Sequence, residues 1–253
     1  MNSNNSNRSR AASARGFLAR FTITPLAALG ILAGTVPAAR AADTTCPPAI
    51  SSGTINGNLT VPAGVTCTLG PGTVTVTGNV HVGKGASLTV KPLGGQTVTI
   101  GGNVQAAQCN AVTLAPFADG FISVGGNVHI QNCTAESGYD GLPPDSAGPV
   151  TISGNFACDH NSAECIARGG FVSGNVRVDN NSNVGGSGAE LLFNHVGGNV
   201  EVNNNSGGLA VTVASNTIGG NLQCARNTPG VTGGLSPNHV TGSKQGQCAG
   251  ANF

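Results

Sequence analysis

The sequence predicts an all-β protein, a right-handed parallel β-helix of about eight coils, with 20–28 residues and about three short strands in each coil. Two observations lead to this prediction. The tripeptide Gly-Asn-apolar recurs eight times, at steps of 21, 24, 24, 28, 20, 24 and 22 residues. The 253 residues also include 40 Gly and only 8% charged residues, whereas an average domain has about 25% charge.

The residues around each repeat asparagine alternate as in a strand with one buried face. These asparagines are Asn58, Asn79, Asn103, Asn127, Asn155, Asn175, Asn199 and Asn221. The first and third residues after each asparagine are mostly apolar and the second is mostly polar, while the third residue before it is always β-branched. One coil cannot bury its apolar face alone, so we expect stacked coils with like residues about 4.8 Å apart.

Other repeat architectures fit the spacing less well. A left-handed hexapeptide helix would show a six-residue period, and a propeller blade needs about 40 residues. A β-sandwich is the remaining alternative. The Gly before each repeat asparagine is expected at a bend that needs positive φ or a close approach of backbone.

Residues 1–41 are typical of a secretory signal peptide. A basic segment is followed by an apolar run and by Ala39-Arg40-Ala41, which fits the A-x-A cleavage pattern. The run is too short and too broken by Pro and Gly for a membrane anchor. We therefore expect cleavage after Ala41, no membrane span in the mature chain, and a secreted, periplasmic or cell-surface location.

The remaining residues 42–253 are expected to form a single β-helix domain, with an N-terminal cap at about 42–54 and a C-terminal cap at about 225–253. Cleavage removes five of the 11 basic residues and none of the ten acidic ones, so the formal net charge changes from +1 to −4. A mildly acidic surface argues against nucleic acid as a partner, because nucleic acid needs a basic patch. A glycan or a surface protein is the expected partner.

The repeat also predicts how the eight cysteines pair. Three pairs occupy equivalent positions on neighbouring coils, at a separation that suits a disulfide, and the last two cysteines would close a small loop. The predicted disulfides are Cys46–Cys67, Cys109–Cys133, Cys158–Cys165 and Cys224–Cys248. No Cys-x-x-Cys pair or Cys/His cluster with zinc spacing occurs, so we expect neither a metal nor a cofactor.

Asparagine also recurs six residues after the repeat asparagine, at Asn161, Asn181, Asn205 and Asn227. Stacked asparagines form amide ladders and tolerate left-handed backbone at a bend. The alternative is a polar row that binds sugar.

The C-terminal segment carries a more specific motif. Residues 219–229 read GGNLQCARNTP and residues 246–248 read GQC. This resembles a group of bacterial exported proteins with GGNV repeats and an ending of the form GGNL-x-C-x-x-N-x-P followed by GQC. The resemblance implies a secreted β-solenoid and supplies no catalytic residue. The coil length is also similar to that of pectin-degrading β-helix enzymes, but their Asn-Thr-Asp, Asp-Asp and Gly-His-Gly motifs are absent.

One pair of acids is a weak candidate for catalysis. Asp159 and Asp179 both lie four residues after a repeat asparagine and should therefore stack as neighbours. Enzymes that act on glycans normally need paired carboxylates. Arg177 and Glu201 lie nearby, two residues after their asparagines, and are candidates for binding. The alternative is structural: Arg177 and Glu201 form a surface salt bridge, and the two aspartates lie at a solvated bend.

A second candidate region is the insertion in the 28-residue step, residues 134–145, with Tyr139, Asp140 and Asp145 as binding candidates. Insertions in solenoids map to loops, often on the binding face, although a surface loop without a role is the alternative. A row of Thr and Ser four residues before the asparagines could order water or ice, but Phe171 and His195 interrupt it.

The sequence thus favours an exported, disulfide-stabilised solenoid with a structural, glycan-binding or protein-binding role and no enzymatic activity. The alternative is a polysaccharide lyase or hydrolase that uses Asp159 and Asp179.

Overall fold

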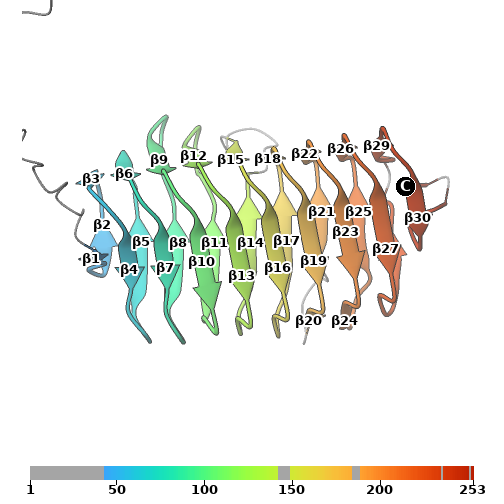
Figure 1. Ribbon diagram of the computed structural model, residues 1–253, viewed down its shortest axis with the longest axis horizontal. Helices are drawn as coiled ribbons and strands as arrows, with labels where there is room; N and C mark the ends of the chain where they lie inside the picture. The colour runs from blue at the N-terminus through green and yellow to red at the C-terminus, as the bar shows by residue number, and fades with distance from the viewer. Residues whose placement is uncertain (1–42, 142–148, 184–188, 235, 251) are drawn as a thin grey trace, which may run out of the picture. The chain divides into compact units, whose positions relative to one another are not determined.

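The computed structural model describes residues 43–141, 149–183, 189–234, 236–250 and 252–253. The predicted signal peptide lies outside these residues, and so does Asp145. The described residues form a parallel β-solenoid whose coils follow one another along its long axis (Figure 1). The predicted fold class is confirmed.

Each coil contributes one strand to each of three parallel sheets, which we call sheets 1, 2 and 3. Sheet 1 contains β1 (Thr44–Thr45), β4 (Leu59–Val61), β7 (Val80–Val82), β10 (Val104–Ala107), β13 (Val128–Gln131), β16 (Phe156–Asp159), β19 (Val176–Asp179), β23 (Val200–Asn203), β27 (Leu222–Ala225) and β30 (Lys244–Gly246). Sheet 2 contains β2 (Ala49–Ile50), β5 (Thr66–Leu69), β8 (Ser87–Val90), β11 (Ala111–Leu114), β14 (Ser137–Asp140), β17 (Cys165–Arg168), β21 (Glu190–Leu192), β25 (Val211–Ala214) and β28 (Val231–Thr232).

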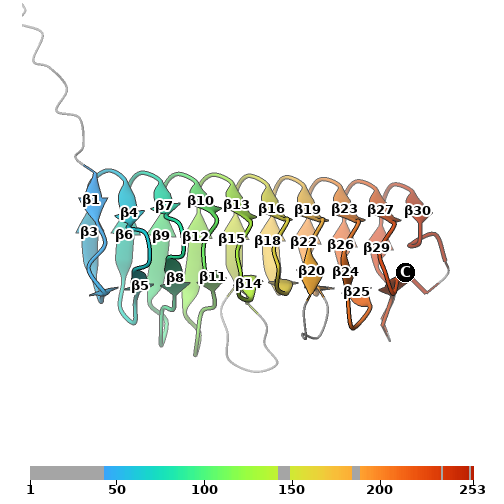
Figure 2. The ribbon, with the colours of Figure 1, turned by 90° about the horizontal axis from the view of Figure 1, so that it is seen from below.

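Sheet 3 contains β3 (Gly53–Ile55), β6 (Val74–Val76), β9 (Thr97–Ile100), β12 (Phe121–Val124), β15 (Val150–Ile152), β18 (Gly170–Val172), β22 (His195–Val196), β26 (Thr217–Ile218) and β29 (His239–Val240). A small extra pair, β20 (Ser182–Asn183) and β24 (Ser206–Gly207), lies outside the three sheets. Seen from below, the strands of sheet 1 run in a regular row along the solenoid (Figure 2).

The alternation read from the sequence matches the burial of the strands. In β7 and β13, for example, the residues in the first and third positions are buried, and the residue between them faces outward and is half-buried. The buried Val, Leu and Ile residues of all three sheets form one continuous core. Burial of this apolar surface is the main favourable contribution to folding.

The two segments expected as caps also pair into the sheets. Strands β1, β2 and β3 pair with β4, β5 and β6, so residues 44–55 form a first coil. At the other end, β28, β29 and β30 continue sheets 2, 3 and 1. Both end segments are therefore part of the stacked coils.

The repeat asparagines form a ladder along the corner between sheet 3 and sheet 1. The backbone N–H and the side-chain Nδ2 of each asparagine donate to Oδ1 of the asparagine on the preceding coil, as Asn155 does to Asn127 at 2.8 and 3.0 Å. Asp43 Oδ1 accepts from Asn58 Nδ2 at one end of the ladder, and Ser243 donates to Asn221 at the other.

This ladder explains the glycine before the repeat asparagine. A Cβ added at Gly154 would lie 2.5 Å from Asn127 Oδ1 and 2.8 Å from the carbonyl oxygen of Gly126. The reason for the glycine is therefore close approach to the preceding coil. Only Gly57, among these glycines, has positive φ, at 114°.

Two further ladders are buried. One consists of Asn161, Asn181, Asn205 and Asn227 and ends on Gln247 Oε1; the other consists of Asn194, Asn216 and Asn238. Their Nδ2 groups donate toward the following coil, in the opposite direction to the exposed ladder. The first confirms the predicted amide ladder, but the left-handed backbone is at the preceding residue, such as His160 with φ of 56°. The hydrogen bonds of the ladders satisfy these amide groups, as buried polar groups require.

The four disulfides in the structure are the four pairs that the repeat predicts: Cys46–Cys67, Cys109–Cys133, Cys158–Cys165 and Cys224–Cys248. Three of them join neighbouring coils, and two of these three lie near the ends of the solenoid. They restrict the unfolded chain and stabilise the coils against separation.

Candidate functional site

A groove crosses the outward face of sheet 1. Its main hollow has a volume of about 500 Å³, and an adjoining hollow of about 380 Å³ shares three of its residues, Gln105, His129 and Gln131. Together they extend over β7, β10, β13, β16 and β19. The groove therefore runs across the strands, along the axis on which the coils stack.

The main hollow includes a position where the outward side chain is small. The outward residues in the second position after the repeat asparagine are in register, and on these five strands they are His81, Gln105, His129, Ala157 and Arg177. Ala157 is the small residue in this row, between two long side chains. Ala157 and Asp159 of β16 both line the hollow.

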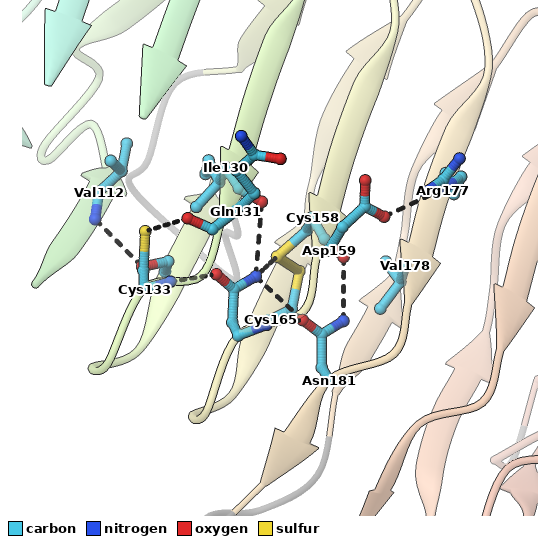
Figure 3. Close-up of a disulfide and its surroundings, with 12 residues drawn as sticks. Val112, Ile130, Gln131, Cys133, Cys158, Asp159, Cys165, Arg177, Val178 and Asn181 are labelled. Carbon is cyan, nitrogen blue, oxygen red and sulfur yellow. Dashed lines mark hydrogen bonds and ion pairs between the residues drawn. A yellow bond between two sulfur atoms is a disulfide. The ribbon is translucent and has the colours of Figure 1, made fainter. Parts of the chain in front are cut away.

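Asp159 lies at the base of this hollow. Its side chain is only 6% exposed, although it points to the outer face. Arg177 Nε donates to Asp159 Oδ1 at 3.0 Å, and His129 Nε2 lies 3.4 Å from Oδ2 (Figure 3 shows the Arg177 contact). A buried carboxylate needs such partners because burial removes its hydration.

The two side chains that contact Asp159 remain accessible. The side chains of His129 and Arg177 are 45% and 46% exposed. Arg177 contacts Asp159 through Nε, and the same atom lies 3.9 Å from Asp179 Oδ2. The groove thus presents positive and hydrogen-bonding groups to solvent above a buried negative charge.

The predicted stacking of Asp159 and Asp179 is present in the register of β16 and β19. Their carboxylates are not a free pair, since Arg177 Nε contacts both and Asn204 Nδ2 donates to Asp179 Oδ1 at 3.0 Å. Both carboxylates therefore already have hydrogen-bond or ion-pair partners within the protein. The two acids are therefore held by an arginine and an amide, and they do not form an unoccupied acid and base.

The expected salt bridge between Arg177 and Glu201 is wrong. The two residues are in register on β19 and β23, but the ion pairs of Arg177 are with Asp159 and Asp179. The physical reason is the small Ala157 on the preceding strand, which leaves room for the guanidinium to turn back to the buried carboxylate. Glu201 is exposed on the next strand, beyond the groove.

The binding candidates of the insertion are also placed differently. Tyr139 is fully buried in β14, where its hydroxyl donates to Asn194 Oδ1 at 3.0 Å and its ring packs edge-on against Phe156. Burial raises the pKa of Tyr139 above its usual range, so the hydroxyl stays protonated. The prediction that Tyr139 binds a partner is wrong, because its position is an inward one, in register with Leu114 and Ala167.

Asp140 follows Tyr139 at the end of β14 and belongs to a second ion-pair cluster. Arg168 contacts Asp140 Oδ2 at 3.0 Å and Glu190 Oε2 at 3.1 Å. The cluster joins three successive strands of sheet 2, β14, β17 and β21. It is a stabilising contact between coils, away from the groove.

The outward face of sheet 3 carries the predicted row of hydroxyl groups. Its consecutive members are in register: Thr54, Thr75, Thr99, Ser123 and Thr151. Phe171 then follows Thr151 in the row, and its ring lies 5.9 Å from that of His195. The row is regular, and it contains no buried charge among the residues described.

The groove contains residues that sequence reasoning did not single out as a site. His129, Gln131 and His160 line it together with Asp159 and Arg177. The available signal was the alanine in an outward row of long polar residues, with an acid two positions further along the same strand. The spacing identified the row but not the hollow.

A disulfide supports the base of the groove. Cys158 precedes Asp159 and bonds to Cys165 on β17 (Figure 3). Asn161 Nδ2 contacts Cys158 Sγ at 3.2 Å and Asn181 Oδ1 at 2.9 Å. The disulfide and the contacts of Asn161 therefore hold the turn after Asp159 against the core. This restricts the movement of Asp159 and His160.

No protein-family model, no curated protein and no solved structure matches the chain. In the described ranges no helix is long and apolar enough to cross a membrane. Across the same ranges, no three His, Cys, Asp or Glu residues gather in a way that could hold a metal ion.

Proposed function

We propose that this protein is exported and binds glycan chains in the groove of sheet 1 without cleaving them. The observation that carries the proposal is the continuous polar groove across five strands, with His129 and Arg177 held in place by the buried Asp159. A groove along the stacking axis fits a linear polymer. Side chains that the protein itself positions can bind a ligand without a large ordering cost.

A binding role agrees better with the acids than a catalytic one. A glycosidase needs two carboxyl groups on opposite sides of the scissile bond, one of them able to give up a proton. Asp159 and Asp179 lie side by side on neighbouring strands, and Arg177 contacts both. Two carboxylates that share one arginine in this way do not flank a scissile bond from opposite sides.

Export rests on two supports. Residues 1–41 have the pattern of a signal peptide, and disulfides form and persist mainly in oxidising compartments outside the cytosol. Four disulfides in a chain with only 8% charged residues suit a stable extracellular or periplasmic rod. The partner is then a glycan of the cell surface, the matrix or a host.

The proposal is tested by measuring binding and turnover on the same panel of polysaccharides. We expect binding without new reducing ends or unsaturated products, and weaker binding for Arg177→Gln and His129→Gln. His239→Gln, a matched change on the outward face of sheet 3, should leave binding unchanged. Absence of glycan binding would overturn the proposal. Product release that Asp159→Asn or Asp179→Asn abolishes would favour the lyase or hydrolase alternative.

A further inference from the structure

The exposed ladder of repeat asparagines borders the groove of sheet 1. Asn103, Asn127 and Asn155 line the main hollow, beside the outward residues of β10, β13 and β16. In every coil that has a repeat asparagine, the sheet 3 strand ends three residues before it and the sheet 1 strand begins directly after it. The corner turns therefore follow one another regularly along the solenoid, at about 4.8 Å for each strand (Figure 2).

The backbone fixes the orientation of each side-chain amide in this ladder. The backbone N–H of Asn127 donates to Asn103 Oδ1 at 2.8 Å, and that of Asn155 donates to Asn127 Oδ1 at the same distance. Because a backbone N–H needs an acceptor, the atom that faces the following coil must be the amide oxygen. Nδ2 lies on the other side of the amide and donates to Oδ1 of the preceding coil.

One hydrogen of each ladder amide is left over. A side-chain amide has two N–H donors, and its oxygen accepts two hydrogen bonds. Asn127 Oδ1 accepts from both nitrogens of Asn155, while Asn127 Nδ2 uses one hydrogen for Asn103. The second hydrogen has no partner among the described residues. Since the amide is planar, it points along the Cβ–Cγ direction, away from the backbone, and the side chain is exposed. The ladder thus offers one amide donor per coil.

The permanent charges beside the groove do not favour an acidic ligand. Arg177 is shared by Asp159 and Asp179, so the carboxylates outnumber the guanidinium. Glu201 adds a further carboxylate in the outward row, on the next strand of sheet 1. An anionic polymer meets a formal excess of negative charge here, whereas an uncharged polymer is not repelled. The amide donors of the ladder suit uncharged oxygen acceptors.

Given the glycan binding proposed above, we infer that the ligand is an uncharged polysaccharide and that the asparagine ladder binds it through one amide N–H in each coil. A pyranose unit of an extended chain is close to one strand spacing in length, so successive sugars present oxygen acceptors to successive asparagines. Gln105 and Gln131, which also line the hollow, supply further amide groups. Among the described lining residues none is Trp, Tyr or Phe, so hydrogen bonds replace the ring stacking that aromatic residues provide.

The first test compares polymers that share a backbone and differ in charge. Hydroxyethyl cellulose and carboxymethyl cellulose form one pair, and galactomannan and its carboxymethyl derivative form a second. We expect the uncharged member of a pair to bind more tightly at low salt, with a difference that narrows as salt is added, because salt screens the repulsion. Equal or tighter binding of the carboxymethyl derivatives would overturn the inference.

The second test changes the ladder itself. Ser243 shows which substitution keeps the ladder contact, since its N–H and its hydroxyl both donate to Asn221 Oδ1, at 2.8 and 2.9 Å. Asn127→Ser retains two such donors but has no outward N–H, and should weaken binding of the uncharged polymer about two- to tenfold. Asn199→Ser makes the same change beside β23, outside the groove, and should lower the urea midpoint similarly while binding is unchanged. Equal losses of binding for both variants would contradict the inference.

A third measurement needs no substitution. In NMR spectra of labelled protein, the side-chain amide signals of Asn103, Asn127 and Asn155 should shift when the uncharged polymer is added, and one hydrogen of each amide should exchange with solvent more slowly. The signals of Asn199 and Asn221, outside the groove, should stay unchanged and serve as the control.

The outcomes separate this inference from the proposed function. If a polysaccharide binds in the groove while the three ladder signals do not change, the glycan-binding function stands and the ladder inference fails. If only acidic polysaccharides bind, the function again stands and the inference fails. If no polysaccharide of any charge binds, both fail.

Discussion

The outward faces of sheet 1 and sheet 3 are built by the same repeat but differ in what they offer a ligand. Sheet 3 presents a row of small hydroxyl residues in register, with Thr75, Thr99 and Ser123 on successive coils. Sheet 1 presents long polar residues interrupted by Ala157, with Asp159 buried beside it. A regular row makes a flat face, whereas a gap in a row of long side chains makes a hollow with a defined base.

The two faces also differ in how their side chains are held. In the row on sheet 3, the side-chain contact is between the rings of Phe171 and His195. On sheet 1, Arg177 and His129 converge on one buried carboxylate. Side chains that are already held in place lose less conformational freedom when a ligand binds, so we assign the ligand to sheet 1.

The largest effect on glycan binding is expected from a variant that fills the hollow. Ala157→Phe should fill the space between His129 and Arg177 and weaken glycan binding by about tenfold or more, which corresponds to about 1.4 kcal/mol or more. Because position 157 faces outward, we expect little change in unfolding. Thr151→Phe makes a similar change on sheet 3 and should leave binding intact. Equal losses for both variants would contradict the assignment.

A second test disturbs the corner that joins the two faces. Gly154→Ala places a methyl group 2.5 Å from Asn127 Oδ1 and 2.8 Å from the Gly126 carbonyl oxygen, so it should lower the free energy of unfolding by about 1–3 kcal/mol. Gly208→Ala has nothing within 4 Å of the added atom and is the control. Urea unfolding of the two variants measures the difference; similar midpoints would show that close packing at this corner is not needed.

A third test examines the ion pair at the base of the groove. Arg177→Gln leaves Asp159 buried with one cation fewer, whereas Asp159→Asn leaves Arg177 half-exposed to water. We expect Arg177→Gln to destabilise by about 1–2 kcal/mol and Asp159→Asn by less, because a buried unpaired charge costs more than a solvated one. Denaturant midpoints of the two variants provide the comparison. The opposite order would mean that Asp159 is solvated by other means.

The smallest effect is expected on sheet 3. Thr99→Val keeps the shape of the side chain and removes one hydroxyl from the row, so we expect a stability change within about 0.5 kcal/mol and no change in glycan binding. The same variant tests the water-ordering alternative. Ice recrystallisation in the presence of the unchanged protein, lost in Thr99→Val, would assign sheet 3 a function that we do not expect.

Register was predictable from the sequence, and orientation was not. The spacing of the repeat is enough to pair Cys109 with Cys133 and to stack Asp159 on Asp179, since equivalent positions on successive coils must be neighbours. The direction of the Arg177 side chain depends on the size of Ala157 one coil away. Such a dependence between coils is not visible in a single repeat.

Tyr139 shows the same limit in the core. Its place in a long insertion with acidic neighbours indicated a surface loop, yet β14 begins at Ser137 and turns the ring inward. The ring fits because Gly170 lies against it; a Cβ at Gly170 would be 2.4 Å from Tyr139 Cε2. The large residue and the glycine that makes room for it lie on different strands, far apart in the sequence, so reading either segment alone does not reveal the match.

The most direct test of the account uses the five histidines as reporters of the two faces. His81, His129 and His160 line the sheet 1 groove, whereas His195 and His239 lie on sheet 3. In a titration of labelled protein with a polysaccharide from the panel that it binds, followed by NMR, we predict shifts of the first three imidazole signals only, with no new reducing ends. Shifts confined to His195 and His239, or cleavage of the polymer, would contradict the account.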